Sequence, residues 1–273
     1  MKSKYKHLSA KQPIGVFDSG VGGLTVAREI RRLLPNEDII YFGDTKHLPY
    51  GDKSKETIAG YSTKIAAFLL EMNCKAIVIA CNTATANALK EVKKLVGNRA
   101  LIIDVVNPVS EKVAYELHQN IGVIATKGTV ASGIYRKAIR KHNKFINVNE
   151  LATPLLVPAI EEGFSNHPIT RAILANYLSN KKLRGIETLI LGCTHYPLLE
   201  REITQYYGKA VKIIDSPQIV ANELRHRLGK HQLLNKDNPQ PSYHFYLSDI
   251  TRNFQRISRK FFGNKIGLEL KVL

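Results

Sequence analysis

Two cysteines of this chain stand in closely matching sequence frames. Cys81 follows the strand-like apolar run 75–80, and Cys193 follows a similar run at 187–192; polar residues follow both cysteines. In an open α/β sheet, ligands bind in the crevice outside the carboxyl ends of the strands, so we expect both thiols to face such a crevice. Two thiols on opposite sides of one site could remove a proton from one face of a carbon atom and return a proton to the other face.

For either cysteine taken singly, the alternative is packing, because free cysteine is among the most buried residue types. The matched frames favour chemistry for Cys81 and Cys193. Cys74 precedes its strand and has no polar frame after it, so it is interpreted as structural. A free thiol has a pKa of about 8.5 and is mostly protonated at pH 7. A helix N-terminus after each of the two strands is expected to lower that pKa.

The rest of the chain predicts the elements that must position these thiols. Strand-like runs alternate with helical stretches, expected over residues 24–34 and 54–71 and up to about 96, which is typical of βαβ units with a mostly parallel sheet. A second copy of this order is expected from residue 120, because Ile121 follows Ile14 by 107 positions and Cys193 follows Cys81 by 112. We therefore predict two similar α/β lobes with their strand ends facing each other.

A glycine-rich loop over residues 18–23 follows the first predicted strand. The loop does not complete a dinucleotide fingerprint, because Thr25 occupies the position of the last glycine, and no Gly-Lys-Ser/Thr sequence completes a phosphate loop. It offers backbone N–H groups at a helix start and the carboxylate of Asp18, a combination suited to a small zwitterion. The alternative is that the glycines only let a helix pack on a strand.

Nucleophilic hydrolysis by Cys193 beside His195 is a second enzymatic alternative. No Gly-x-Ser-x-Gly elbow is present in the sequence, and a cysteine hydrolase would need only one reactive thiol. The matched frame of Cys81 would then have no role, so the pair favours proton transfer.

Composition excludes several classes of protein. The chain has 273 residues, 44% of them hydrophobic, and three cysteines without the paired spacing of a zinc site or a disulfide framework. These features predict a globular protein without metal in a reducing cytoplasm, and no run of about 18 apolar residues indicates a membrane span. The net charge of +17 raises a nucleic-acid alternative, but aromatic residues are not interleaved among the basic ones, so specific recognition is not expected.

Several stretches of the chain are similar to glutamate racemases, a family of cofactor-independent amino-acid racemases that use two cysteines. The stretches are residues 15–24, 41–44, 49–51, 80–84, Val157-Pro158 with Glu161, and residues 191–199, and the C-terminal part around 245–263 also resembles the ending of that family. The resemblance implies two flavodoxin-like lobes, one formed by residues 1–105 and 216–273 and the other by 106–215, with the active site in the cleft between them.

The resemblance also implies the roles of individual residues. Cys81 would take the proton from the D enantiomer and Cys193 from the L enantiomer, with Asp18 assisting near Cys81 and Glu161 and His195 assisting near Cys193. The residues implied in substrate binding are Asp18, Ser19, Tyr50, Gly51, Asn82, Thr83, Thr126, Thr194 and His195.

The function implied is interconversion of L- and D-glutamate, without a cofactor, for peptidoglycan synthesis in the cytoplasm. Aspartate and hydantoin racemases share the two-cysteine plan, and an aspartate or broad-range amino-acid racemase stays open as the alternative. The partner implied is glutamate, without a membrane or a specific nucleic acid, and a homodimer is one of the assemblies that the family allows.

Overall fold

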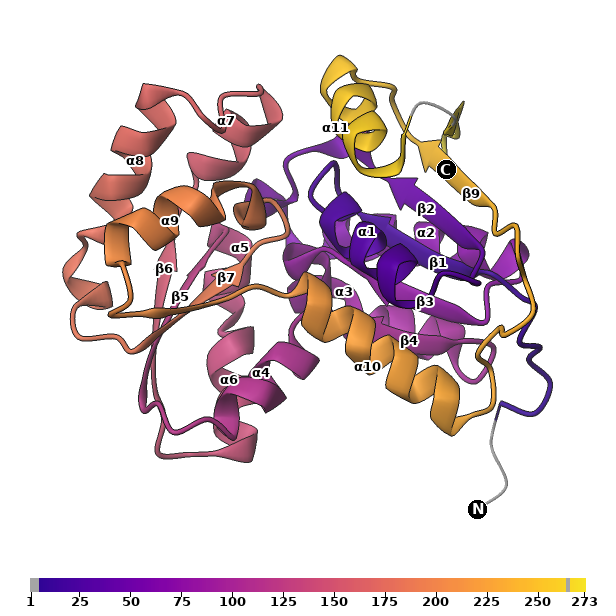
Figure 1. The fold of residues 1–273 in the computed structure, drawn as a ribbon, viewed down its shortest axis with the longest axis horizontal. Helices are drawn as coiled ribbons and strands as arrows, with labels where there is room; N and C mark the ends of the chain where they lie inside the picture. The colour runs from indigo at the N-terminus through magenta and orange to yellow at the C-terminus, as the bar shows by residue number, and fades with distance from the viewer. Residues whose placement is uncertain (1–4, 264–265) are drawn as a thin grey trace.

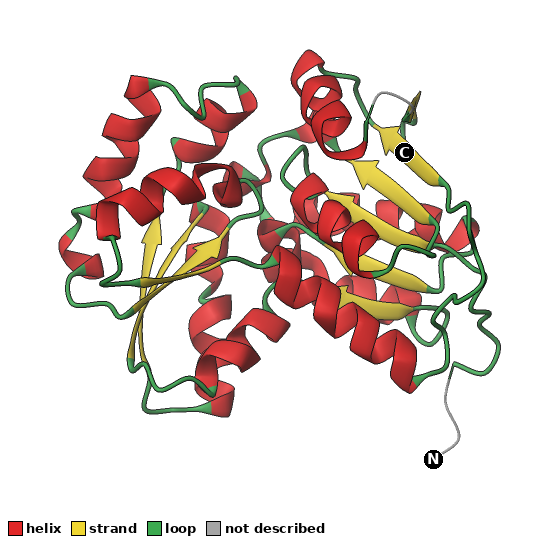
Figure 2. Cartoon of the chain, in the orientation of Figure 1, coloured by secondary structure: helices red, strands yellow, loops and turns green. Residues whose placement is uncertain are grey.

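The computed structural model describes residues 5–263 and 266–273 and places them in two α/β lobes (Figures 1 and 2). The first lobe is built on a six-stranded sheet in the order β10-β9-β2-β1-β3-β4, and the second on a four-stranded sheet in the order β6-β5-β7-β8. All described strand pairs are parallel. The strands are β1 (Ile14–Asp18), β2 (Ile39–Gly43), β3 (Ala76–Ile79), β4 (Leu101–Asp104), β5 (Asn120–Ala125), β6 (Asn147–Ala152), β7 (Thr188–Gly192), β8 (Lys212–Ile214), β9 (Tyr243–Leu247) and β10 (Gly267–Leu270).

The two sheets repeat one strand order, since β2-β1-β3-β4 in the first lobe corresponds to β6-β5-β7-β8 in the second. The prediction of two similar lobes with mostly parallel sheets is therefore confirmed. The larger sheet takes β9 and β10 from the C-terminal part of the chain, so the chain returns to the first lobe after forming the second (Figure 1). The predicted lobe limits, 1–105 with 216–273 and 106–215, stay a prediction.

Helices cover both faces of each sheet. In the first lobe, α2 (Lys55–Glu71) and α3 (Asn82–Val96) pack on one face, and α1 (Leu24–Leu33), α10 (Pro217–Lys230) and α11 (Arg252–Phe262) on the other. In the second lobe, α4 (Asn107–Ala114) and α6 (Ile134–His142) lie opposite α7 (Leu156–Glu161), α8 (Pro168–Leu178) and α9 (Glu200–Tyr207). The short α5 (Lys127–Ser132) follows β5 and contacts α3 of the first lobe.

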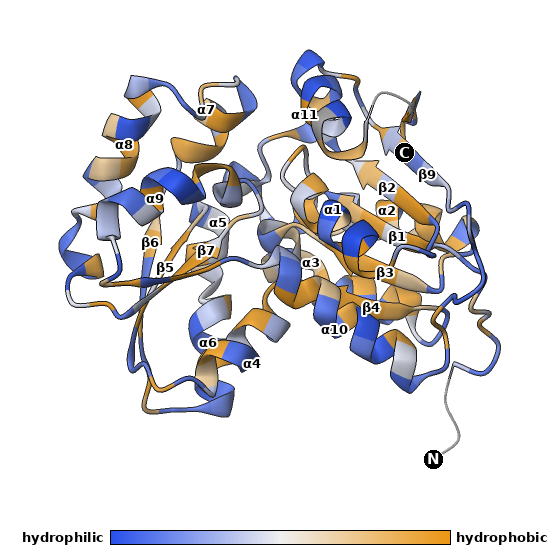
Figure 3. Ribbon diagram, viewed as in Figure 1, coloured by the Kyte–Doolittle hydropathy of each residue, from blue (hydrophilic) through white to orange (hydrophobic). Residues whose placement is uncertain are grey.

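The strands of both sheets are largely hydrophobic (Figure 3), and their side chains alternate between the two faces of each sheet. Ile14 and Val16 of β1 join one hydrophobic cluster, and Phe17 joins the cluster on the opposite face. The cluster of Ile14 and Val16 continues into the second lobe through Val113 of α4 and Ile139 of α6. The two lobes are therefore joined by one continuous apolar core.

The helices predicted at 24–34 and 54–71 are found with small shifts at their ends. Ser54 is the N-cap of α2, and its Oγ accepts a hydrogen bond of 3.2 Å from the backbone N–H of Thr57. The helix start predicted after Cys193 is wrong, because a 3₁₀ turn (Tyr196–Leu199) stands there and α9 begins only at Glu200. Pro197 lies in this turn and restricts the residue before it. The other 3₁₀ turns are Thr45–His47, Tyr50–Asp52 and Lys181–Leu183.

Candidate active site

Cys81 and Cys193 line the same cavity between the two lobes. Cys81 lies just beyond the carboxyl end of β3 and Cys193 directly after β7, and these strands pair with β1 and β5, the first strand of each repeat. This position beside the first strand is where ligands bind in flavodoxin-like folds. Other predicted residues that line the cavity are Ser19, Tyr50, Gly51, Asn82, Thr83, Thr126, Thr194 and His195.

Cys81 is the N-cap of α3, and its sulfur is held by two neighbours. The backbone N–H of Ala84 lies 3.4 Å from Cys81 Sγ, and the thiol donates to Ser19 Oγ over 3.7 Å. Burial, followed by the negative charge of Asp18, nevertheless raises the pKa of the Cys81 thiol to about 12. The N–H group at the helix start does lower the pKa of Cys81, as expected, but the loss of water around the sulfur and the charge of Asp18 outweigh this contact.

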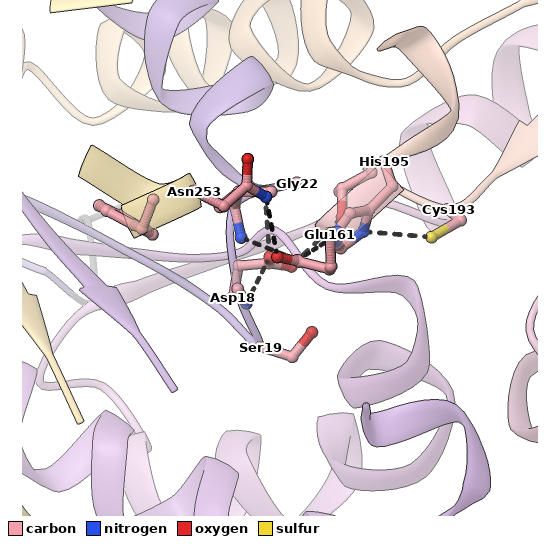
Figure 4. Close-up of polar contacts among 12 residues, drawn as sticks. Asp18, Ser19, Gly22, Glu161, Cys193, His195 and Asn253 are labelled. Atoms are coloured by element: carbon pink, nitrogen blue, oxygen red, sulfur yellow. Dashed lines mark hydrogen bonds and ion pairs between the residues drawn. The ribbon is translucent and has the colours of Figure 1, made fainter. Parts of the chain in front are cut away.

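Cys193 faces a chain of polar contacts that ends on α11 (Figure 4). Its Sγ lies 3.6 Å from Nδ1 of His195, and Nε2 of His195 lies 2.5 Å from Oε1 of Glu161. Glu161 also accepts hydrogen bonds of 3.4 Å from the backbone N–H of Val21 and from Nδ2 of Asn253. Side chains from the loop after β7, from α7 and from α11 thus meet behind the Cys193 sulfur.

His195 and Glu161 form a buried ion pair. Burial alone would lower the pKa of His195, but its hydrogen bonds to Cys193 and Glu161 outweigh burial and raise the pKa well above the ordinary value. Burial alone would likewise raise the pKa of Glu161, but the contacts with His195 reverse the direction and lower it. The imidazole is therefore protonated at neutral pH, with one ring nitrogen directed to Glu161 and the other to the sulfur.

Asp18 does not line the cavity but lies behind its wall, fully buried. Its Oδ2 accepts from the backbone N–H groups of Gly20 and Gly23 at 2.9 and 3.0 Å, and Thr194 Oγ1 donates to its Oδ1 over 3.3 Å. Burial raises the pKa of Asp18 above its usual range. The expectation that the N–H groups of this loop bind a zwitterion is wrong for these two groups, because Asp18 already uses them.

Two glycines of the loop are required by side chains of the second lobe. A Cβ atom at Gly22 would lie 2.5 Å from Thr194 Oγ1 and 2.6 Å from His195 Nδ1, and a Cβ at Gly20 would lie 2.7 Å from Glu161 Oε1. These distances are shorter than a side chain tolerates. The glycines therefore do more than pack a helix on a strand, because they allow the Glu161–His195 pair to approach the first lobe.

Hydroxyl groups from both lobes meet at the opposite wall of the cavity. Thr83 Oγ1 lies 2.9 Å from Thr126 Oγ1, and the buried Thr129 lies within 3.0 Å of Thr126 and 3.4 Å of Thr83. Gly51 allows the close approach of Thr126, since a Cβ at this position would lie 2.9 Å from the threonine Cβ. Nearby, the Tyr50 hydroxyl donates to Asp44 Oδ2 over 2.5 Å.

Sequence reasoning missed several residues of the site, namely Asp44, Thr129, Tyr135, Thr153 and Asn253. Thr129 could have been found, because it stands three residues after the N-cap Thr126, where a cap side chain reaches the backbone N–H. Asn253 and Tyr135 carry no local signal, since they reach the site only through the return of the chain and the packing of α6.

The cavity between the thiols is small. Its volume of about 30 Å³ has room for only one or two water molecules. A larger hollow of about 670 Å³ adjoins it, and Leu48, Pro49, Val157 and Pro158 line both. The two spaces therefore adjoin each other at these four residues.

Other features of the described residues bear on the remaining expectations. In residues 5–263 and 266–273, no cluster of three or more His, Cys, Asp or Glu side chains could hold a metal ion, and no helix is long and apolar enough to cross a membrane. Cys74, Cys81 and Cys193 are all free. Burial raises the pKa of Cys74 to about 12, and its sulfur packs near Gly15, away from the cavity.

Comparison with known proteins gives one consistent result. A family model described as Asp/Glu/hydantoin racemase matches residues 14–224. A glutamate racemase from Geobacter metallireducens is 42% identical over 255 residues, covering 93% of this chain and 94% of the relative. One from Neisseria meningitidis serogroup A is 44% identical over 259 residues, covering 94% and 95%.

Solved structures resemble the whole fold. The crystal structure of a glutamate racemase from Francisella tularensis in complex with D-glutamate superposes with a TM-score of 0.88 at 38% identity, covering 97% of this chain and 98% of that one. A glutamate racemase isoform from Bacillus anthracis gives a TM-score of 0.90 at 36% identity, covering 96% and 98%.

Proposed function

This chain belongs to the Asp/Glu/hydantoin racemase family, and on that premise we propose that it interconverts L- and D-glutamate by proton transfer between the α-carbon and two thiols. The product D-glutamate would supply peptidoglycan synthesis. The observation that carries the mechanism is the placement of Cys81 and Cys193 in one enclosed cavity, each beyond the equivalent strand of a repeated lobe.

The two thiols would act on opposite faces of the substrate. Cys81 as thiolate takes the α-proton of D-glutamate, and the Cys193 thiol gives a proton to the other face of the resulting carbanion; the L enantiomer reacts in the reverse direction. Because burial raises the pKa of Cys81, its thiolate is scarce at neutral pH. The ammonium group of glutamate, placed beside the sulfur, would donate a hydrogen bond and bring a positive charge, and both favour the thiolate.

His195 and Glu161 would serve Cys193. The imidazolium holds a proton at Nδ1, 3.6 Å from the sulfur, so it can supply this proton to the Cys193 thiolate; the neutral imidazole that remains can then take a proton back from the thiol. Glu161 keeps the imidazole protonated and fixes its orientation. Asp18 contacts the cavity lining through Thr194, and its negative charge raises the pKa of Cys81.

The substrate would be held by neutral donors. Hydroxyl and amide groups from both lobes line the cavity, and such groups can bind both carboxylates without neutralising a thiolate; the donors proposed are Ser19, Asn82, Thr83, Thr126 and Thr194. They also offset the negative charge that develops when the α-proton leaves. Tyr50 and Gly51 complete the wall nearest to Thr126.

Three further points belong to this proposal. The free cysteines support a reducing cytoplasm as the compartment. The lobes would divide at about residues 105 and 215, which the strand composition of the two sheets supports. A homodimer, one of the assemblies that the family allows, is compatible with this proposal, which includes no specific nucleic-acid partner.

The test is racemisation in heavy water, followed by proton NMR of the α-carbon and by circular dichroism. Wild type should interconvert the enantiomers without added cofactor and place solvent deuterium at Cα of each new enantiomer. Replacing Cys81 or Cys193 by serine should abolish net racemisation, because a hydroxyl is a far weaker acid than a thiol.

Each single variant retains one thiol, which gives a second readout. Cys193→Ser should still exchange the α-proton of D-glutamate without inversion, and Cys81→Ser that of L-glutamate. Cys74→Ser is the matched control and should turn over nearly as wild type. Wild-type rates in Cys193→Ser, or a folded but inactive Cys74→Ser enzyme, would refute the two-thiol assignment.

A further inference from the structure

Asn82 has one half of its side-chain amide satisfied and the other half unpaired. It is the first residue of α3, directly after Cys81, and it lines the cavity while its side chain is almost fully buried. Its Oδ1 accepts a hydrogen bond of 2.6 Å from the hydroxyl of Tyr135. Its Nδ2 is buried and has no hydrogen-bond partner among the described residues.

Tyr135 reaches Asn82 from the other lobe. It stands in the first turn of α6 and belongs to the apolar core that joins the lobes, with no exposed surface. Burial raises the pKa of Tyr135 above its usual value, so the hydroxyl keeps its proton and donates it. A donor on this side selects the carbonyl oxygen of the amide, and the NH₂ group is then turned away from Tyr135.

A buried NH₂ group without an acceptor is unfavourable, so buried polar groups of this kind are nearly always paired. Here the group belongs to a residue that lines the cavity between the thiols, and an oxygen acceptor that enters the cavity would satisfy it. A carboxylate is the best acceptor for two amide hydrogens, and charged acceptors form the stronger hydrogen bonds.

We infer that Tyr135 is a positioning residue that holds the Asn82 amide with its NH₂ group directed to a carboxylate of the substrate. This inference rests on the proposed function, which supplies a dicarboxylate as the ligand. The Tyr135 ring is fixed by the core of the second lobe, and Asn82 is fixed by α3 of the first. The Tyr135–Asn82 hydrogen bond therefore joins the two lobes beside the substrate site. It also preorganises the Asn82 NH₂ group before the substrate binds.

The test compares Tyr135→Phe with a matched tyrosine variant. Tyr207 of α9 donates from its hydroxyl to the backbone oxygen of Leu178, outside the cavity lining, so Tyr207→Phe removes a hydroxyl from the same lobe without touching Asn82. Tyr135→Phe should raise KM for both enantiomers by roughly tenfold while kcat changes less than about threefold. Tyr207→Phe should leave both constants within about twofold of wild type.

A double-mutant cycle with Asn82→Ala tests whether Tyr135 acts through Asn82. Once the amide is gone, adding Tyr135→Phe should change KM by less than about twofold. If the KM of the double variant rises by the product of the two single-variant increases, Tyr135 and Asn82 act independently and the inference is overturned. An unchanged KM in Tyr135→Phe, or a loss confined to kcat, would also overturn it.

Side-chain amide NMR separates this inference from the proposed function. The Asn82 signals are identified by their absence from Asn82→Ala, and D-glutamate should shift them in wild type but need about tenfold more ligand in Tyr135→Phe. A protein that shows these shifts without racemising glutamate would refute the proposed function and support the role of Tyr135. If the enzyme is active but its Asn82 signals do not shift at saturating glutamate, the role of Tyr135 is refuted while the proposed function stands.

Discussion

Replacing Glu161 by glutamine removes the negative charge from the buried pair behind Cys193 and leaves its shape nearly unchanged. The amide oxygen can still accept from Nε2 of His195, which now lies 2.5 Å from the carboxylate. The side chain of His195 is 3% exposed and that of Glu161 is 17% exposed, so little water reaches the imidazolium to compensate for the lost charge. Because an uncompensated buried charge is costly, we expect Glu161→Gln to lower the free energy of unfolding by about 3 kcal/mol at pH 6.5.

The prediction is tested by the pH dependence of the difference in unfolding free energy between wild type and Glu161→Gln. The folded pKa of His195 is raised, so its contribution to stability is fully present below the unfolded pKa of 6.5 and is lost as the pH rises through the folded pKa. The folded pKa of Glu161 is lowered, so its contribution to stability is present above the unfolded pKa of 4.5 and is lost as the pH falls through the folded pKa. Above pH 6.5, folding takes up one proton in wild type and none in the variant. The gap between the two should narrow by about 1.4 kcal/mol per pH unit until the folded pKa of His195 is reached.

Urea unfolding of both proteins at pH 6.5, 7.5 and 8.5 measures this gap. Glu162→Gln is the matched control, because Glu162 is the neighbouring carboxylate and is exposed, and its effect should be small at every pH. A gap that stays constant from pH 6.5 to 8.5, or that widens, would show that the His195–Glu161 pair is not charged in the folded protein.

Three other predictions concern the enzyme as a catalyst. Asn253→Ala removes the 3.4 Å hydrogen bond to Glu161 and should lower kcat/KM by about two- to fivefold. The decrease should be equal for L- and D-glutamate, because the two enantiomers have equal free energy. Gln255→Ala, on the same helix, is the control and should leave kcat/KM unchanged. Activity should survive dialysis against a chelator and treatment with hydroxylamine, and restoration by a metal or by pyridoxal phosphate would contradict the mechanism. Aspartate should be racemised with a kcat/KM at least about tenfold below that of glutamate, because its shorter side chain leaves donors unpaired, and comparable values would indicate a broader racemase.

The parts of the site that were predictable from the sequence are those fixed by local pattern. The frames around Cys81 and Cys193 place both thiols at strand ends, and the parallel strand order then brings them to one cavity. Ser19 and Thr126 are similar cases, because each directly follows the first strand of its repeat. The repeat itself was visible as two landmarks at nearly one offset.

The parts that were not predictable depend on contacts between distant elements. Asn253 and Glu161 are 92 positions apart in the sequence, and Tyr135 and Asn82 are 53 apart. The sequence around these residues contains no pattern that predicts either contact. The pKa of Cys81 also depends on the three-dimensional setting, because the helix start is a local feature but the exclusion of water is not.

The late return of the chain to the larger sheet also determines the order of events during synthesis. Ser242 donates its backbone N–H to Asp38 across 204 positions, and β9 then pairs with the outer side of β2. At about 5–20 residues per second, β2 leaves the ribosome roughly 10–40 s before β9 exists. During that interval β2 is an unpaired edge of apolar sequence, the kind of edge that invites association with other chains. Nascent chains whose synthesis stops before β9 therefore expose the unpaired edge of β2, which β9 covers in the complete protein.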